Sequence, residues 1–321
     1  MDKHVLRGKK GLSQDPIFIV GYPRSGTTLL QSLLATQGNI VTFPETHFFY
    51  TLRTKYENTT ETVQKSRVWE FLQEITRVSG VEFSESDIVP LGDLDWISTK
   101  ELFEFIVWKF LPENVPNDFR WLEKTPDHAF FLEDIGSFYP NAKFVGIVRH
   151  PFPAIFSRTR YFPPKTQDLL GFLSRQWVVY AQSLEEFKKA YPEKIMLIKY
   201  EDLVQSPLDV TSTIADFLSV PFNPGALSQR VQVADTIIQP FEHWKADVRN
   251  PEIRNTNREV KGLFSLGDRL KIQSIVCGQM RRYGYAGTQT FLQLVYQLCF
   301  LWLPSLLKRV MSQAKKISGH L

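Results

Sequence analysis

IFIVGYPRSGTTLLQSLL, residues 17–34, is the segment from which the architecture of this chain is best inferred. It begins with a short apolar run, 17–20, whose β-branched members are typical of a strand buried on both faces of a parallel sheet. A loop containing glycine and proline follows, and leucines then recur at helical spacing over 29–34. The order of strand, loop and helix predicts an α/β fold.

The same alternation recurs along the chain. Apolar runs with β-branched members predict further strands at 40–42, 144–148 and 195–198, and a weaker pattern predicts one at 120–123. Helical patterns lie between them, at about 62–79, 99–111, 168–190 and 208–219. Strands that alternate with helices predict a doubly wound, mostly parallel sheet in a single domain. In such a sheet ligands bind beyond the carboxyl ends of the strands, so the residues after each strand are the candidates for chemistry.

Length and composition indicate an ordinary globular protein. The chain has 321 residues, 43% hydrophobic and 22% charged, and we expect a flexible lead over 1–15 and one domain over 16–286. The net charge of +4 comes from dispersed basic residues, which does not indicate a nucleic-acid groove. Two cysteines form no disulfide framework, and the polar first ten residues lack the apolar stretch of a secretory signal. We therefore expect a cytoplasmic protein.

The C-terminal segment 287–321 is apolar first and then basic. Residues 283–307 carry no formal charge, 291–303 are strongly apolar, and Lys308 and Arg309 follow. A spanning helix needs about 20 apolar residues, and the glutamines and proline in this stretch weaken that interpretation. A helix lying in the membrane interface, with its basic end at anionic headgroups, fits better. A core or dimer-interface helix remains an equal alternative.

The loop over 21–28 has the chemistry of an anion cradle. Its glycines let successive backbone N–H groups point inward, and the helix that follows adds unpaired donors and a partial positive charge. The side-chain donors are Arg24, Ser25, Thr27 and Thr28, around Gly26. The loop departs from a Walker A sequence because Thr27 stands where that motif has lysine, and no acidic strand end suited to Mg²⁺ is evident. An ordinary strand-to-helix turn is the alternative.

A second motif, FVGIVRHPFPAIFSR at 144–158, places Arg149 at a strand end and Ser157 in the next helix. The segment 17–34 resembles the 5′-phosphosulfate loop of sulfotransferases that use 3′-phosphoadenosine 5′-phosphosulfate (PAPS), in particular the bacterial and protein-tyrosine branch. The segment 144–158 resembles the 3′-phosphate motif of that family, and the resemblance spans about 16–285. It implies PAPS as donor, adenosine 3′,5′-bisphosphate as product, no required metal, and a hydroxyl acceptor on a carbohydrate, lipid, tyrosine or small metabolite.

The 3′-phosphate would be held by three side chains. Arg149 can bind a phosphate in bidentate fashion, and Ser157 can add a hydrogen bond. By analogy with protein-tyrosine sulfotransferases, Tyr200 contributes a phenolic contact. The alternatives are a surface ion-pair arginine, a serine on a helix surface and a core tyrosine.

Sulfuryl transfer also needs a base and cations. We expect Glu45 to be the base, as in the same branch of the family; a carboxylate can take this role if a buried site raises its pKa toward neutrality. His47 is the rival, or it orients Glu45 or contacts the acceptor. Lys124, in a Lys-x-Pro element of that branch, is the expected cation on the sulfuryl oxygens, with Arg24 at the leaving phosphate. The alternatives are a solvated loop carboxylate for Glu45 and an exposed side chain for Lys124.

Two other functions compete with sulfuryl transfer. A P-loop kinase or nucleoside triphosphatase would need a lysine after Gly26 and a magnesium-binding acid. A non-catalytic nucleotide-binding protein of the same fold would make Glu45 and Lys124 dispensable. The run around 244–245 and 255–261 stands where sulfotransferases close a loop over the nucleotide, but its match is loose and assigns no residue.

Overall fold

The computed structural model describes residue 12 and residues 15–55, 61–88, 95–162, 167–257 and 264–285. They form two compact units. The first contains the described residues of Met1–Arg149 and Ser183–Asn255, and the second those of His150–Gln182 and Thr256–Leu321. The C-terminal segment 287–321, for which membrane contact was predicted, lies outside the described residues. Among the described helices, none has both the length and the apolar character required to cross a membrane.

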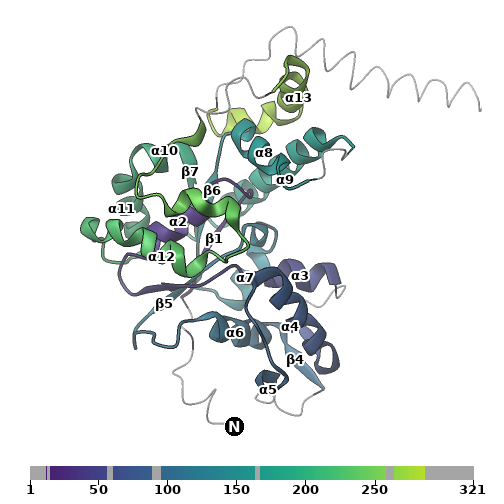
Figure 1. Ribbon diagram of the computed structural model, residues 1–321, viewed down its shortest axis with the longest axis vertical. Helices are drawn as coiled ribbons and strands as arrows, with labels where there is room; N and C mark the ends of the chain where they lie inside the picture. The colour runs from purple at the N-terminus through teal and green to yellow at the C-terminus, as the bar shows by residue number, and fades with distance from the viewer. Residues whose placement is uncertain are drawn as a thin grey trace, which may run out of the picture. The chain divides into compact units, whose positions relative to one another are not determined.

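The first unit is built on a five-stranded sheet in which every neighbouring pair is parallel (Figure 1). Its order is β2-β5-β1-β6-β7. The strands are β1 (Ile17–Gly21), β2 (Ile40–Thr42), β5 (Arg120–Lys124), β6 (Lys143–Val148) and β7 (Ile195–Lys199). Each corresponds to a strand predicted from the sequence. The α/β fold class is confirmed.

Helices and short 3₁₀ turns connect these strands. The helices of the first unit are α2 (Thr27–Leu34), α3 (Phe48–Lys55), α4 (Lys65–Ser79), α5 (Glu85–Ile88), α6 (Thr99–Phe110), α7 (Leu132–Phe138), α10 (Tyr200–Gln205), α11 (Pro207–Leu218) and α12 (Arg230–Ile237). The 3₁₀ turns are η2 (Pro126–Phe130), η3 (Pro224–Gln229) and η4 (His243–Arg249). The helix predicted from about 62 begins at Lys65, because β3 (Thr62–Gln64) pairs instead with β4 (Trp96–Ser98) as an antiparallel ribbon.

The second unit holds α8 (Pro151–Thr159) and α13 (Leu266–Arg282), and α9 (Leu169–Ala190) begins in it and ends in the first unit. Two proline residues stand in the first turn of α8, where a missing N–H removes no helical hydrogen bond. Phe264 packs against Phe152 and Phe156 of α8, with ring centroids 6.0 and 5.6 Å apart. Aromatic packing therefore joins Phe264 to α8.

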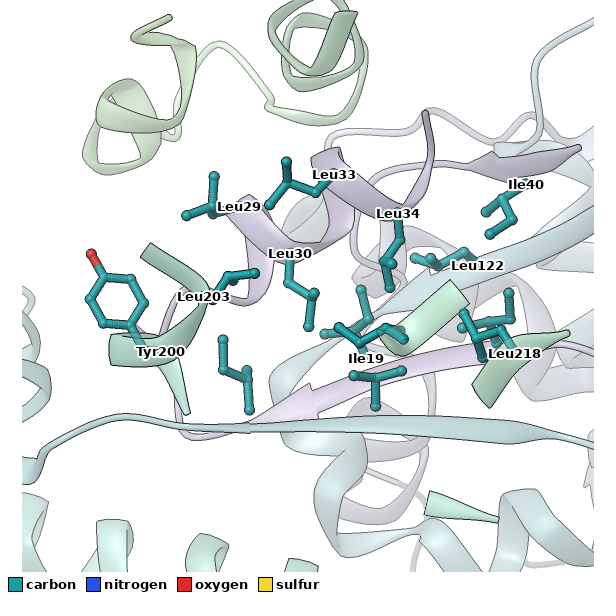
Figure 2. Close-up of a cluster of buried hydrophobic side chains, with 14 of the residues drawn as sticks. Ile19, Leu29, Leu30, Leu33, Leu34, Ile40, Leu122, Tyr200, Leu203 and Leu218 are labelled. Carbon is teal, nitrogen blue, oxygen red and sulfur yellow. The ribbon is translucent and has the colours of Figure 1, made fainter. Parts of the chain in front are cut away.

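Alternation along β1 gives the sheet two buried faces. Ile17 and Ile19 point to one side, where the leucines of α2 cover them together with residues of α10 and α11 (Figure 2). Phe18 points to the other side and meets Trp121 edge-on, with centroids 5.5 Å apart, and stacks with Phe144 at the same distance. All three isoleucine and phenylalanine side chains of β1 are fully buried, so each contributes roughly 1.5–3 kcal/mol of hydrophobic stabilisation.

Parallel pairing brings the carboxyl ends of the five strands to one edge. Gly21 of β1 pairs with Ile147 of β6, and Ile19 pairs with Lys124 of β5. The segments that follow β2, β5, β1, β6 and β7 therefore meet along this edge in that order. These segments carry Glu45, Lys124, the loop of 21–28, Arg149 and Tyr200.

Candidate functional site

The loop between β1 and α2 has a backbone that few residue types can adopt. Gly26 caps α2 with φ 93°, and a Cβ atom there would lie 2.5 Å from the Cδ2 atom of Tyr200. Glycine is therefore required both by the left-handed conformation and by the close ring. Arg24 also has a positive φ, 73°, which is uncommon for a residue with a side chain. The loop is thus curled as an anion cradle requires.

The cradle contains a buried hydroxyl donor that is bound to no described residue. Ser25 Oγ is fully buried and makes no hydrogen bond to any described residue. Thr27 and Thr28 are also buried in the first turn of α2, which carries no acidic residue. A buried hydroxyl without a partner normally costs about 1–3 kcal/mol. An anionic oxygen beside the helix N-terminus would satisfy it, so the residues fit a phosphate or phosphosulfate group.

Arg149 joins the second motif to this loop. Its Nη1 atom donates to the backbone oxygen of Arg24 at 2.9 Å, and its guanidinium lies 4.2 Å from the centre of the Tyr200 ring. Arg149 is 7% exposed, so the alternative of a surface ion-pair residue is wrong. Tyr200 is buried, and its hydroxyl donates to the backbone oxygen of Arg254 at 3.3 Å. Ser157 lies on α8 in the second unit, and its phosphate contact stays a prediction.

Glu45 lies at the centre of a charged cluster. Lys124 donates to its Oε1 atom in a very short contact, and Lys245 Nζ donates to the same oxygen at 2.6 Å. His47 Nε2 lies 3.3 Å from Oε2 of Glu45. The side chains of Glu45 and Lys124 are 12% and 1% exposed. Neither the solvated carboxylate nor the exposed lysine considered for the sequence describes these residues.

The positive side chains around Glu45 shift its pKa in the direction opposite to the effect of burial. Burial raises this pKa, but the positive charges of Lys124, Lys245 and His47 outweigh burial, and the pKa lies well below its ordinary value. The raised pKa considered for a Glu45 base is therefore not found, because Lys245, which the sequence did not place here, adds its charge to that of Lys124. The pKa of Lys124 is lowered to about 8, mainly by burial. The charge of Glu45 opposes this lowering, and the charge of Lys245 adds to it.

Lys245 and Glu242 belong to the cluster although the sequence assigned them no role. Lys245 lies on η4 and also pairs closely with Glu242. Burial lowers the pKa of Lys245, but Glu45 and Glu242 more than compensate and raise it above its ordinary value. The only signal in the sequence was the loosely matching run around 244–245. Lys245 joins a carboxylate 200 residues away, a pairing that no local pattern encodes.

A second buried carboxylate supports the segment that carries Glu45. Glu123 is fully buried on β5, and its Oε1 atom accepts from the hydroxyl of Thr46 at 2.9 Å and from that of Thr125 at 2.5 Å. Its Oε2 atom lies 2.8 Å from Nδ1 of His128. Thr125 Oγ1 also accepts from the backbone N–H of His47 at 3.2 Å. Hydrogen bonds thus hold the backbone on the C-terminal side of Glu45.

The first unit therefore brings together Arg24, Ser25, Gly26, Thr27, Thr28, Glu45, His47, Lys124, Arg149 and Tyr200 at one sheet edge. Within the described ranges, no group of three or more His, Cys, Asp or Glu is arranged to hold a metal ion. An anion cradle, a lysine-bound carboxylate and a buried arginine suit the transfer of a charged group to an acceptor.

Comparison with known proteins agrees with this geometry. Residues 16–224 match the model of the Sulfotransferase family. This chain belongs to the sulfotransferase family. The match covers both anion-binding motifs as well as Glu45 and Lys124, but it ends before Lys245.

Two curated relatives are similar to this sulfotransferase. A putative protein-tyrosine sulfotransferase of Caenorhabditis elegans is 26% identical over 169 residues, which cover 49% of this chain and 65% of the relative. An uncharacterized protein of Aquifex aeolicus (strain VF5) is 23% identical over 230 residues, which cover 69% of this chain and 28% of the relative. The chain thus spans less than two thirds of the length of either relative.

Solved structures share the fold of this sulfotransferase. The sulfotransferase domain of the Synechococcus PCC 7002 olefin synthase gives a TM-score of 0.60 at 19% identity, covering 87% of this chain and 98% of that one. The sulfotransferase domain of the curacin biosynthetic pathway gives 0.57 at 22% identity, covering 87% and 100%. Mouse sulfotransferase SULT7A1, complexed with PAP, gives 0.51 at 16% identity, covering 88% and 89%. At these identities the likeness shows the fold alone.

Proposed function

We propose that this sulfotransferase takes its sulfuryl group from PAPS and transfers it to a hydroxyl acceptor. The observation that carries the donor assignment is the contact between the two anion-binding motifs, in which Arg149 Nη1 donates to the Arg24 oxygen at 2.9 Å. A nucleotide with phosphates on both its 5′ and 3′ oxygens needs two such holders close together. The structure of SULT7A1 complexed with PAP supports this choice of donor.

The chain's residues divide between the two ends of the donor. Ser25, Thr27, Thr28 and the backbone of the curled loop would hold the 5′-phosphosulfate. Arg149 would hold the 3′-phosphate; the role of Ser157 stays a prediction from the sequence motif. Tyr200 would assist through its ring, which supports the Arg149 guanidinium, because its hydroxyl already donates to a backbone oxygen.

The transfer is a direct displacement at sulfur. The acceptor oxygen forms a bond to sulfur while the bond from sulfur to the bridging phosphate oxygen breaks, and its electron pair stays on the leaving phosphate. The hydroxyl proton passes to the carboxylate of Glu45. Arg24 stabilises the charge on the leaving phosphate, and Lys124 stabilises the sulfuryl oxygens.

The contact between Glu45 and Lys124 links donor binding to the base. Lys124 and Lys245 hold the pKa of Glu45 well below its ordinary value, so the carboxylate is a weak base while both lysines contact it. A lysine that turns to the sulfuryl oxygens stabilises the Glu45 anion less, and the pKa rises. Glu45 thereby becomes a stronger base when the donor is in place. His47, 3.3 Å from Glu45, orients the carboxylate.

Peptidyl tyrosine is the first acceptor to test. The resemblance of the chain to PAPS-dependent sulfotransferases leaves carbohydrate, lipid, tyrosine and small metabolites as acceptor classes. The Caenorhabditis elegans relative is named a putative protein-tyrosine sulfotransferase, which favours tyrosine among them. A tyrosine-containing peptide therefore belongs in every screen, together with oligosaccharides and small phenols.

Thermal stabilisation tests the donor site. We expect adenosine 3′,5′-bisphosphate to raise the Tm, since a ligand at about 100 times its Kd stabilises by about 2.7 kcal/mol. Arg149→Ala should abolish the shift, and Arg77→Ala, which alters an exposed arginine of α4, should leave it unchanged. A shift with ATP and Mg²⁺ but none with the bisphosphate would instead support a kinase or nucleoside triphosphatase.

Transfer of radiolabelled sulfate from PAPS tests the role of Glu45. We expect Glu45→Gln to lower transfer to the responsive acceptor class by about 10²–10⁴-fold, the usual contribution of a positioned base. Bisphosphate binding should persist in this variant. Transfer by Glu45→Gln at the wild-type rate would remove Glu45 as base and favour His47. If the wild-type protein binds the bisphosphate but transfers sulfate to none of the acceptors, the result would support a non-catalytic nucleotide-binding protein.

A further inference from the structure

The 3₁₀ turn η4 lies against the donor loop of the first unit. Arg24 Nη2 donates to the backbone oxygen of Trp244 at 2.7 Å. The next residue, Lys245, is 6% exposed and points to Glu45 rather than to solvent. One turn therefore contacts the cation of the phosphate loop and the expected base at the same time.

Lys245 and Lys124 stand in the same relation to one anionic oxygen. Both ammonium groups donate to Oε1 of Glu45. The two lysines approach from different elements, β5 and η4, so they flank the oxygen. Two cations placed this way can equally flank an oxygen of a bound sulfonate, which carries negative charge spread over its three oxygens.

The charge balance of the cluster favours an anion once Glu45 is protonated. Lys124 and Lys245 are matched by Glu45 and Glu242, which is a costly arrangement in a buried site unless each charge is paired. Once Glu45 takes the acceptor proton, its charge is lost and the lysines lack one counter-charge. The negative charge that the sulfonate oxygens already carry can supply it.

We propose that Lys245 is a second sulfonate-binding cation that acts with Lys124, and that it thereby favours PAPS over its desulfated product. The inference rests on the proposed function, because it takes PAPS as the donor. Adenosine 3′,5′-bisphosphate has the same two phosphates but no sulfonate. A residue that contacts the sulfonate alone must therefore affect the binding of PAPS and leave the binding of the bisphosphate nearly unchanged.

Binding of both nucleotides to the full chain, measured calorimetrically without acceptor, tests this. We expect Lys245→Met to weaken PAPS binding about 10-fold or more and bisphosphate binding less than about threefold, and Lys245→Arg to retain most of the preference. Lys109→Met, which removes an ion pair on α6, should change neither affinity. If Lys245→Met weakens the affinity for both nucleotides equally, or weakens neither affinity, the proposal is overturned.

Glu242→Gln provides a test that does not remove the cation. It deletes a counter-charge of Lys245 and should increase the preference for PAPS over the bisphosphate. If Lys245 merely held η4 in place, this variant would lower the affinity for both nucleotides alike. That result would contradict the proposal. A wild-type chain that binds neither nucleotide would overturn the proposed function itself, whereas binding of both without discrimination by Lys245 overturns only this inference.

Discussion

Lys124 shows how burial and charge compete at a single residue. Its side chain is 1% exposed, and burial disfavours the ammonium form. Its contact with Glu45 favours that form, whereas the nearby Lys245 disfavours it. The result is a pKa of about 8, low enough for the charge to be lost within the range in which enzymes are assayed. The proposed reaction needs this charge.

The pH dependence of the rate follows from that pKa. We expect kcat/KM for PAPS to fall as the pH rises through about 8, because the Lys124 ammonium that the sulfuryl oxygens require is deprotonated above its pKa. The apparent value belongs to the coupled cluster of Lys124, Glu45 and Lys245. Initial rates measured from about two pH units below that pKa to about two units above it test this dependence.

Lys124→Met is the matched control for the pH profile. It should lower the rate throughout and remove the descending limb near pH 8. A wild-type profile that stays flat as Lys124 is deprotonated would show that its charge plays no part in transfer.

The segment between β2 and α3 is shaped by an element distant in sequence. Glu123 of β5 accepts from the hydroxyl of Thr46, 77 residues earlier, and Thr125 binds the backbone of His47. His47 itself has a positive φ of 52°, which the surrounding hydrogen bonds must maintain. The position of Glu45, immediately before Thr46, therefore depends on the fully buried carboxylate of Glu123.

Removal of the Thr46 hydroxyl tests this positioning role. Thr46→Val keeps the side-chain shape but leaves Glu123 with one donor fewer, and we expect transfer to fall about 10-fold, equivalent to about 1.4 kcal/mol. Bisphosphate affinity should stay unchanged, because the donor loop follows β1 instead. Radiolabelled transfer and calorimetry measure the two effects.

Two variants control for general damage. Thr46→Ser keeps the hydroxyl and should restore most of the rate. Thr211→Val alters a buried threonine of α11 whose Oγ1 makes no hydrogen bond to a described residue, and it should leave transfer unchanged. A Thr46→Val variant with the wild-type rate would contradict the positioning role of Glu123.

At the scale of the whole chain, the sequence hypothesis of membrane contact concerns residues outside the described ranges. Residues 283–307 carry no formal charge and are followed by Lys308 and Arg309. We expect the full chain to float with vesicles containing anionic phosphatidylserine, and a 1–286 truncation to float less, because the basic end is attracted to anionic headgroups. Vesicles of neutral phosphatidylcholine should bind both proteins less. Equal flotation of the two proteins would end the hypothesis.

The sequence was informative wherever structure and chemistry are local. The strand, glycine loop and helix of 17–34 predicted β1, the curled loop and α2, because alternation, glycine conformation and helical spacing are properties of neighbouring residues. The strand ends then pointed to Lys124 and Arg149. Parallel pairing makes all such ends meet at one edge, so residues far apart in sequence could be assigned to one site before their contacts were known.

Tertiary structure alone decided which charges surround the base. Lys245 reaches Glu45 across 200 positions, and Arg24 reaches Trp244 across 220. No spacing rule encodes such contacts, since they depend on how η4 packs against the end of the sheet. The pKa of Glu45 depends on the sum of burial and of these charges, and the sign of that sum changed once the lysines were in place. The chain thus indicated a carboxylate at position 45, while packing set its electrostatic state.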